Sequence, residues 1–82
     1  MFLAAQISLY PLRQSDLSPA ISNAVSILSE HGLEVSPGVM SSLASGDDEA
    51  LFAAIKDIFQ KSAEQGNLVM VVTLSNACPV SQ

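Results

Sequence analysis

Residues 7–21 read ISLYPLRQSDLSPAI, and this stretch contains the end of a strand, two prolines and the start of a helix. Over residues 2–10 apolar side chains recur at every second position, which is typical of a strand with one apolar face. Pro11 has no N–H to donate to a sheet and is predicted to end this strand. Ser18 then takes the position of a helix N-cap, with Pro19 at the first helical position. The stretch therefore predicts a strand that leads into a helix.

The helix that starts at Ser18 is predicted to end near Gly32, a residue type favoured just beyond helix ends. Its apolar residues are spaced three and four apart and predict one buried stripe: Ile21, Ala24, Val25 and Leu28. After it, residues 33–36 predict a short strand, Pro37 and Gly38 a turn, and residues 39–45 a second strand.

A second helix is predicted after Gly46, with Asp47 as its capping residue and the acidic Asp48 and Glu49 near the positive end of its dipole. Its predicted buried stripe comprises Leu51, Phe52, Ile55, Ile58 and Phe59, and Gly66–Asn67 is expected to end it. Residues 68–74 (LVMVVTL) form the strongest predicted strand of the chain.

The predicted order is βαββαβ. We expect an α+β, ferredoxin-like fold, in which a four-stranded antiparallel sheet carries both helices on one face. Residues 1–76 are expected to form this single domain, and residues 77–82 a short C-terminal tail.

Two helices cover only one face of such a sheet, yet the last predicted strand is apolar on both sides. Val69 and Val71 would lie beside Phe2, Ala4 and Tyr10 on the face that the helices leave uncovered. Because a monomer rarely exposes so large an apolar patch, we expect two sheets to pack face to face in a homodimer or homotetramer.

The 82-residue chain has three basic and eight acidic residues, with a formal net charge of -5. Three scattered basic side chains cannot form the basic stripe that nucleic acid requires, so no nucleic-acid partner is expected. The N-terminal segment lacks the basic region of a signal peptide, and no apolar run is long enough to span a membrane. With Cys78 as the only cysteine, the chain is expected to be cytoplasmic.

Three features could carry chemistry, and each has a simpler structural interpretation. His31 lies at a predicted helix end, where it complements the dipole, and the chain has no second histidine. Cys78 has no base close in sequence. Residues 47–49 have the composition of a capped helix start rather than a metal site. The sequence contains no nucleophile elbow, P-loop or dinucleotide motif, so we expect no enzyme activity, no cofactor and no metal site.

We expect the first and third strands to be parallel neighbours whose C-terminal ends, Ser8–Tyr10 and Ser42–Gly46, meet at one edge of the domain. Both helices are expected to begin at this edge. It would gather a tyrosine, several hydroxyls and the Asp47 carboxylate, which suit a small polar heteroaromatic ligand. A binding module is therefore favoured over an enzyme.

Four segments along the chain together resemble a known family: ISLYPLRQSDLSPAI, HGLEVSPG, VMSSLASGD and VVTLSNACP. Their order is similar to that of the YkoF-like, thiamine-binding superfamily, and the similarity spans nearly the whole chain. The family's third-strand pattern matches residues 38–47, with Ser42 in place of the usual threonine. Ser45 stands where the family often has glutamate.

The resemblance implies a ferredoxin-like fold, assembly into dimers or tetramers, and binding of thiamine or its hydroxymethylpyrimidine moiety without catalysis. On this basis Ser8, Tyr10, Ser42 and Asp47 are the expected ligand-binding residues. The alternative is an ACT-like regulatory or protein-interaction domain with another ligand. The first loop, which has prolines but no glycine, counts against this alternative.

Overall fold

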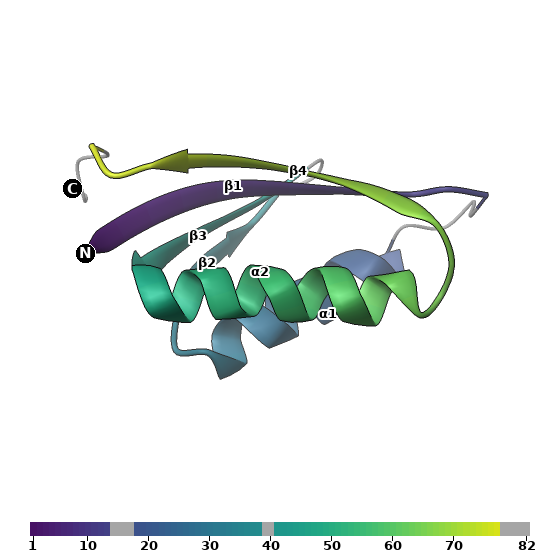
Figure 1. Cartoon of the computed structure of the whole chain (residues 1–82), viewed down its shortest axis with the longest axis horizontal. Helices are drawn as coiled ribbons and strands as arrows, with labels where there is room; N and C mark the ends of the chain where they lie inside the picture. Colours follow the sequence, from purple (N-terminus) through teal and green to yellow (C-terminus); the bar gives the residue numbers. More distant parts are fainter. Residues whose placement is uncertain (14–17, 39–40, 78–82) are drawn as a thin grey trace.

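The computed structural model describes residues 1–13, 18–38 and 41–77. The elements follow the predicted βαββαβ order (Figure 1). They are β1 (Phe2–Pro11), α1 (Ser18–Glu30), β2 (Glu34–Pro37), β3 (Ser42–Asp47), α2 (Asp48–Ala63) and β4 (Leu68–Ser75). The third strand continues two residues beyond its predicted end, and residues 39–40 of the prediction lie outside the described residues.

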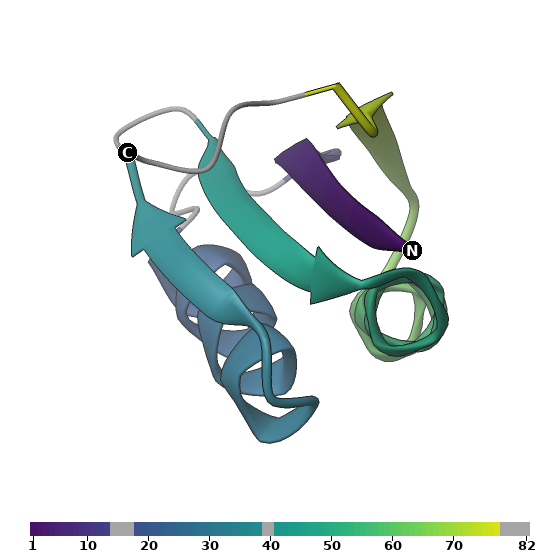
Figure 2. The same ribbon diagram turned by 90° about the vertical axis from the view of Figure 1, so that its left-hand side faces the viewer.

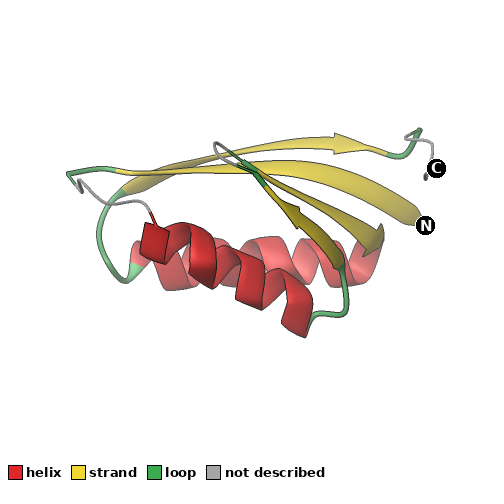
Figure 3. Cartoon of the chain, turned by 180° about the vertical axis from the view of Figure 1, so that it is seen from behind, coloured by secondary structure: helices red, strands yellow, loops and turns green. Residues whose placement is uncertain are grey.

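The four strands form one sheet in the order β2-β3-β1-β4, and each pair of neighbours is antiparallel. Both helices lie on the same side of this sheet, and no element of the described chain covers the other side (Figure 3). The predicted ferredoxin-like α+β fold is confirmed. We call the uncovered side the open face. Among the described residues, no helix is long and apolar enough to cross a membrane.

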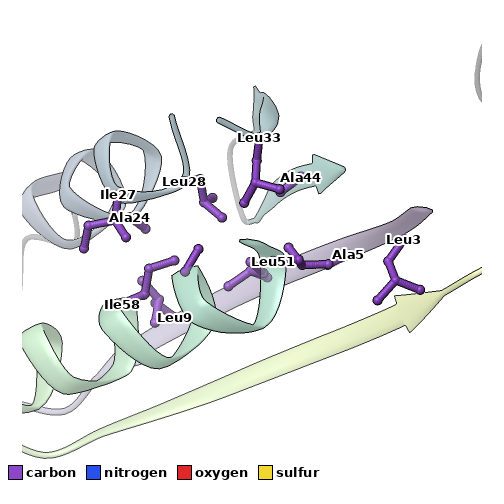
Figure 4. Close-up of a cluster of buried hydrophobic side chains, with 12 residues drawn as sticks. Leu3, Ala5, Leu9, Ala24, Ile27, Leu28, Leu33, Ala44, Leu51 and Ile58 are labelled. Carbon is purple, nitrogen blue, oxygen red and sulfur yellow. The ribbon is translucent and has the colours of Figure 1, made fainter. Parts of the chain in front are cut away.

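The core lies between the sheet and the helices (Figure 4). Alternate residues of β1 face it, and Leu28, Leu51 and Ile58 from the two helices have no exposed surface. The buried apolar side chains are Leu3, Ala5, Ile7, Leu9, Ala24, Ile27, Leu28, Leu33, Ala44, Leu51, Ala54 and Ile58. Full burial of each large side chain contributes about 1.5–3 kcal/mol, so this small set supplies most of the fold's stability.

Helix α1 ends as its sequence predicts. Gly32 has φ of 79°, a left-handed conformation that glycine adopts without steric cost. Its N–H donates to the carbonyl of Ser29, and the Leu33 N–H donates to the carbonyl of Leu28. These two bonds form a Schellman motif, and the buried side chains of Leu28 and Leu33 supply the apolar contact that accompanies it.

Helix α2 begins at its predicted cap but buries a narrower stripe than predicted. The Asp47 carboxylate accepts a hydrogen bond from the Glu49 N–H. Leu51 and Ile58 are buried, whereas Phe52 and Phe59 remain 51% and 42% exposed, so their predicted burial is wrong for this chain. The core extends no further around the helix because α2 lies at the β4 side of the sheet, with no other described helix or strand beyond it (Figure 2).

Candidate functional site

The pairing of β1 with β3 separates residues that the sequence was expected to bring together. These strands are antiparallel, with Phe2 opposite Asp47 and Ile7 opposite Ser42. The expectation of parallel strands is wrong, because the β2–β3 hairpin reverses the chain before β3. The C-terminal ends of β1 and β3 therefore lie at opposite ends of the sheet. The helices also begin at opposite ends, α1 near Tyr10 and α2 near Phe2.

Ser8 and Tyr10 lie on the open face, where the N-terminal half of β4 is their neighbour. Ser8 pairs with Val71 and Tyr10 with Val69, and both valines are 49% exposed. Tyr10 is 43% exposed. On the same face, the Gln6 amide donates to the Ser41 hydroxyl across 3.2 Å, a contact that sequence reasoning missed. Ser8 and Tyr10 thus share a surface that is largely apolar.

Ser42 lies on the other side of the sheet. Its partners in the neighbouring strands are Ile7 and Pro37, and like Ile7 it faces the helices. Only 5% of Ser42 is exposed, and it is the only polar residue among the buried residues described. Within the described part of the chain, the Ser42 hydroxyl has no hydrogen-bond partner. An unpaired buried hydroxyl costs about 1–3 kcal/mol, which makes this group the most unusual one at the predicted site.

Asp47 lies at the other end of β3, where its carboxylate interacts with the start of α2 and with the N-terminus. Besides capping α2, its Oδ1 lies 3.5 Å from the Met1 ammonium nitrogen, and Asp48 Oδ1 lies 3.4 Å from the same nitrogen. The hydrogen bond and charge of Asp48, together with the charge of Asp47, raise the pKa of the Met1 ammonium above its usual 8.0. Five residues of extended strand, roughly 17 Å, separate Asp47 from Ser42. One small ligand cannot contact both side chains within a single chain.

His31 and Asp57 form a contact that the sequence did not indicate. His31 Nε2 lies 2.9 Å from Asp57 Oδ2, and both side chains are partly buried. His31 was expected to complement the dipole of α1; the contact that the structure shows is the one with Asp57 of the neighbouring helix. No group of three potential metal ligands occurs in the residues that the structure describes. Cys78 lies outside those residues.

The structure brings Ser8 and Tyr10 together on the open face, places Ser42 behind them at the same end of the sheet, and leaves Asp47 apart. Ser42 is the only one of the four whose polar group is both buried and unpaired in the described structure. Its hydroxyl can donate and accept a hydrogen bond, which suits a ring nitrogen or an amine of a bound ligand.

Solved structures share this fold at low sequence identity. A hypothetical protein from Methanocaldococcus jannaschii (MJ1052) has a TM-score of 0.86 at 17% identity, and the match covers 98% of this chain and 84% of that protein. Protein SP2199 from Streptococcus pneumoniae has a TM-score of 0.84 at 16% identity, covering 99% and 92%. At these identities the likeness establishes the fold alone.

A third structure is that of TM0486 from Thermotoga maritima, described provisionally as a thiamine biosynthesis/salvage protein. It has a TM-score of 0.79 at 14% identity, and the match covers 92% of this chain and 83% of that protein. No curated protein matches the chain. The model of the YkoF-related family, however, matches residues 3–81. Because this match spans nearly the entire sequence, the chain belongs to the YkoF-related family.

Proposed function

We propose that this chain is a non-catalytic binding protein for thiamine or its hydroxymethylpyrimidine moiety. Membership of the YkoF-related family supports a small-molecule binding role. The fold shared with a protein described provisionally as acting in thiamine biosynthesis or salvage supports the choice of ligand. The candidate residues supply hydrogen-bonding groups but no nucleophile paired with a base, which favours binding over a reaction.

The observation that carries the proposal is the buried hydroxyl of Ser42, which has no hydrogen-bond partner among residues 1–13, 18–38 and 41–77. An aminopyrimidine offers ring nitrogens that accept hydrogen bonds and an exocyclic amine that donates them, and a serine hydroxyl can serve either group. Ligand contact with Ser42 requires the side chains that exclude solvent from it to move. The ligand would then supply the hydrogen bond that this hydroxyl lacks in the described part of the chain, so the energy gained on binding is larger than at an exposed serine.

Ser8 and Tyr10 offer a second set of contacts on the opposite face of the sheet. The ring of Tyr10 can stack with a thiazolium cation, and the acidic chain favours a cationic ligand. These residues can contact a ligand held between two copies of the chain, whereas Ser42 can contact one within a single copy. Ligand binding at Ser8 and Tyr10 should therefore depend on assembly of the protein, whereas ligand binding at Ser42 should not. Asp47, occupied by its cap and by Met1, is the weakest of the four candidates.

Calorimetry with thiamine and with hydroxymethylpyrimidine tests the proposal. We expect heat with at least one ligand, and a Ser42→Ala change should weaken binding by roughly 3- to 10-fold, the equivalent of one neutral hydrogen bond. Ser36→Ala is the matched control, because Ser36 is exposed on β2. A Tyr10→Phe change keeps the ring and should have less effect than Tyr10→Ala. The absence of heat with both ligands would refute the proposal.

We also propose that the protein assembles as a homodimer or homotetramer through the open face. Its large exposed side chains come from three strands: Phe2, Tyr10, Leu43, Val69 and Val71. The charged residues of this face, Glu34 and Asp47, lie toward its margins, on the edge strand β2 and at the end of β3. A second copy can thus cover the uncharged centre without opposing like charges there.

Sedimentation measurements on wild type and on a Val71→Lys variant test this assembly. We expect wild type to sediment above its 8.6 kDa monomer mass, and the lysine to shift the equilibrium toward monomer because it places two cations against each other across a two-fold axis. Glu34→Gln is a control at the margin of the face. Wild type that remains a monomer at all concentrations would rule this assembly out.

A further inference from the structure

Strand β1 continues past the start of β3, as Figure 1 shows. Its pairing with β3 stops at the Ile7–Ser42 pair, whereas its pairing with β4 runs on to the Pro11–Leu68 pair. In the part of the chain that the structure describes, residues 8–11 of β1 therefore have a strand partner on the β4 side alone. Their other side faces the position that a longer β3 would occupy.

Two hydrogen bonds show which backbone groups of β1 point toward the β3 side. On the β4 side, the Leu12 N–H donates to the Asn67 carbonyl across 2.9 Å. On the β3 side, the Asp48 N–H donates to the Met1 carbonyl across 2.9 Å. Since hydrogen-bonded residues alternate along an antiparallel ladder, even-numbered residues of β1 bond to β4 and odd-numbered residues face β3. The N–H and C=O of Leu9 therefore point toward the β3 side, past the residue at which that strand begins.

The backbone groups that face this side are too few for an added peptide strand. Among the described residues, no strand residue lies opposite Leu9 on the β3 side. The next odd-numbered residue, Pro11, has a carbonyl but no N–H. Ser8 and Tyr10 direct their backbone groups to β4 instead. A bound peptide strand needs several residues that each donate and accept, whereas a small molecule needs only the one N–H and C=O pair of Leu9.

We propose that the backbone of Leu9 binds the edge of a heteroaromatic ligand on which a ring nitrogen stands next to an exocyclic amine. The inference rests on the proposed function and names the chemical class of its ligand. In an extended residue the N–H and C=O point the same way, so the N–H donates to the ring nitrogen and the C=O accepts from the amine. An aminopyrimidine has this edge. A pyrimidinone, with a carbonyl in place of the amine, presents its donor and acceptor in the reverse order and does not match.

Ser42 lies within reach of a ligand bound in this way. It pairs with Ile7, so the position opposite Leu9 is two residues, or roughly 7 Å, along the strand from it. A ligand whose aminated edge bonds to Leu9 can thus bring its second ring nitrogen toward the Ser42 hydroxyl, which donates to it. Ser42 and Leu9 are only 5% and 8% exposed. Hydrogen bonds formed here are shielded from water and are therefore stronger than at the surface.

Calorimetry and NMR on the full chain test this role of Leu9, with hydroxymethylpyrimidine and with its analogue in which a carbonyl replaces the amine. We expect the analogue to bind roughly tenfold more weakly or worse, because it loses both bonds to Leu9. Saturation with hydroxymethylpyrimidine should slow hydrogen exchange of the Leu9 amide by roughly tenfold or more, whereas the Ser8 and Tyr10 amides, which bond to β4, should change less.

The outcomes separate this inference from the proposed function. Heat with hydroxymethylpyrimidine but no change at the Leu9 amide overturns the role of Leu9 and leaves the proposed function standing. Equal affinity for the two compounds does the same, because the amine would then contribute nothing. The absence of heat with both hydroxymethylpyrimidine and thiamine refutes the proposed function, and the role of Leu9 with it.

Two variants show whether Leu9 or Ser42 distinguishes the amine. In Ser42→Ala both compounds should bind more weakly, but the preference for the amine should stay at roughly tenfold or more, because it belongs to the Leu9 backbone. Ser36→Ala, exposed on β2, is the matched control and should leave both affinities unchanged. Circular dichroism shows whether each variant is folded, and the exchange measurement on wild type depends on neither. Loss of the preference in a folded Ser42→Ala variant would assign the amine to the Ser42 hydroxyl and overturn the role of Leu9.

Discussion

His31 Nε2 and Asp57 Oδ2 lie 2.9 Å apart, and this contact joins the residue that follows α1 to the middle of α2. We predict that loss of either partner destabilises the fold by about 0.5–1.5 kcal/mol, the usual net value of one hydrogen bond. For a domain of this size, 1 kcal/mol corresponds to a melting temperature lower by roughly 4–8 °C. Thermal unfolding of His31→Ala and Asp57→Ala measures the effect.

The double variant distinguishes the contact from the separate losses of two side chains. If the two groups interact, His31→Ala combined with Asp57→Ala costs less than the sum of the single changes. Strictly additive losses would show that the contact contributes nothing to stability in solution. Lys56→Ala, one residue away on the exposed side of α2, is a control for changes on the helix itself.

Leu51 and Phe52 are neighbours in α2, but one is buried and the other half exposed. We therefore predict that Leu51→Ala destabilises the fold much more than Phe52→Ala. Leu51 has no exposed surface, so Leu51→Ala should cost about 2–5 kcal/mol, enough to leave a domain this small close to unfolded. Phe52 is 51% exposed, so Phe52→Ala should cost less than half as much in dilute solution. Urea unfolding of both variants measures the difference. Equal losses would mean that Phe52 is buried in solution.

The features that the sequence predicted correctly are local. The Asp47 cap and the glycine ending of α1 depend on residues a few positions apart, and the alternation of β1 follows from period two. The direction of β3 relative to β1 depends on how the whole chain folds back, and the wrong assumption of parallel strands placed Asp47 and Tyr10 at the same end of the sheet. The strand order itself follows from the element order and general connection rules.

The sequence also predicted too wide a buried stripe on α2, and this error has a different cause. Periodicity shows which residues are apolar, but not which of them have a partner. Leu51 and Ile58 are fully buried in the core, whereas Phe52 and Phe59 remain 51% and 42% exposed. The His31–Asp57 pair could not be predicted either, because no sequence pattern relates the end of one helix to the middle of another. The candidate site is limited in the same way: the sequence predicted Ser42 as a candidate, but its burial became apparent only from the strand register.

Gly46 lies against Leu33, and we predict that Gly46→Ala is destabilising. A Cβ at this position would come within 2.5 Å of Leu33 Cδ2. Leu33 is buried and belongs to the motif that ends α1, so its displacement disturbs both the core and that helix end. Overpacking of this kind costs about 1–3 kcal/mol. Thermal unfolding measures it, and Leu33→Ala in the same chain should relieve part of the clash. A wild-type melting temperature for Gly46→Ala would contradict the close approach.

The Met1 ammonium gives the chain a pH dependence that can be measured at one site. Asp48 and Asp47 raise the pKa of this group in the folded state above its usual 8.0. The stabilising contact is therefore fully present below pH 8 and is lost as the pH rises through the higher folded-state value. An NMR titration of the Met1 amino group should show the raised pKa, and Asp48→Asn should lower it. A wild-type pKa at or below 8.0 would show that the contact does not form.

Ser42 provides a prediction in which stability and binding move in opposite directions. Since its buried hydroxyl has no partner in the described structure, Ser42→Ala removes a polar group that the empty protein leaves unsatisfied. We expect the ligand-free variant to be as stable as wild type or more stable, by up to about 1–3 kcal/mol, while its affinity for ligand falls. Thermal unfolding with and without thiamine or hydroxymethylpyrimidine measures both effects on the same samples. Ser36→Ala should change neither, because that hydroxyl is already in water. If Ser42→Ala instead destabilised the ligand-free protein, the hydroxyl would have a structural partner, and its assignment to a ligand would lose its physical basis.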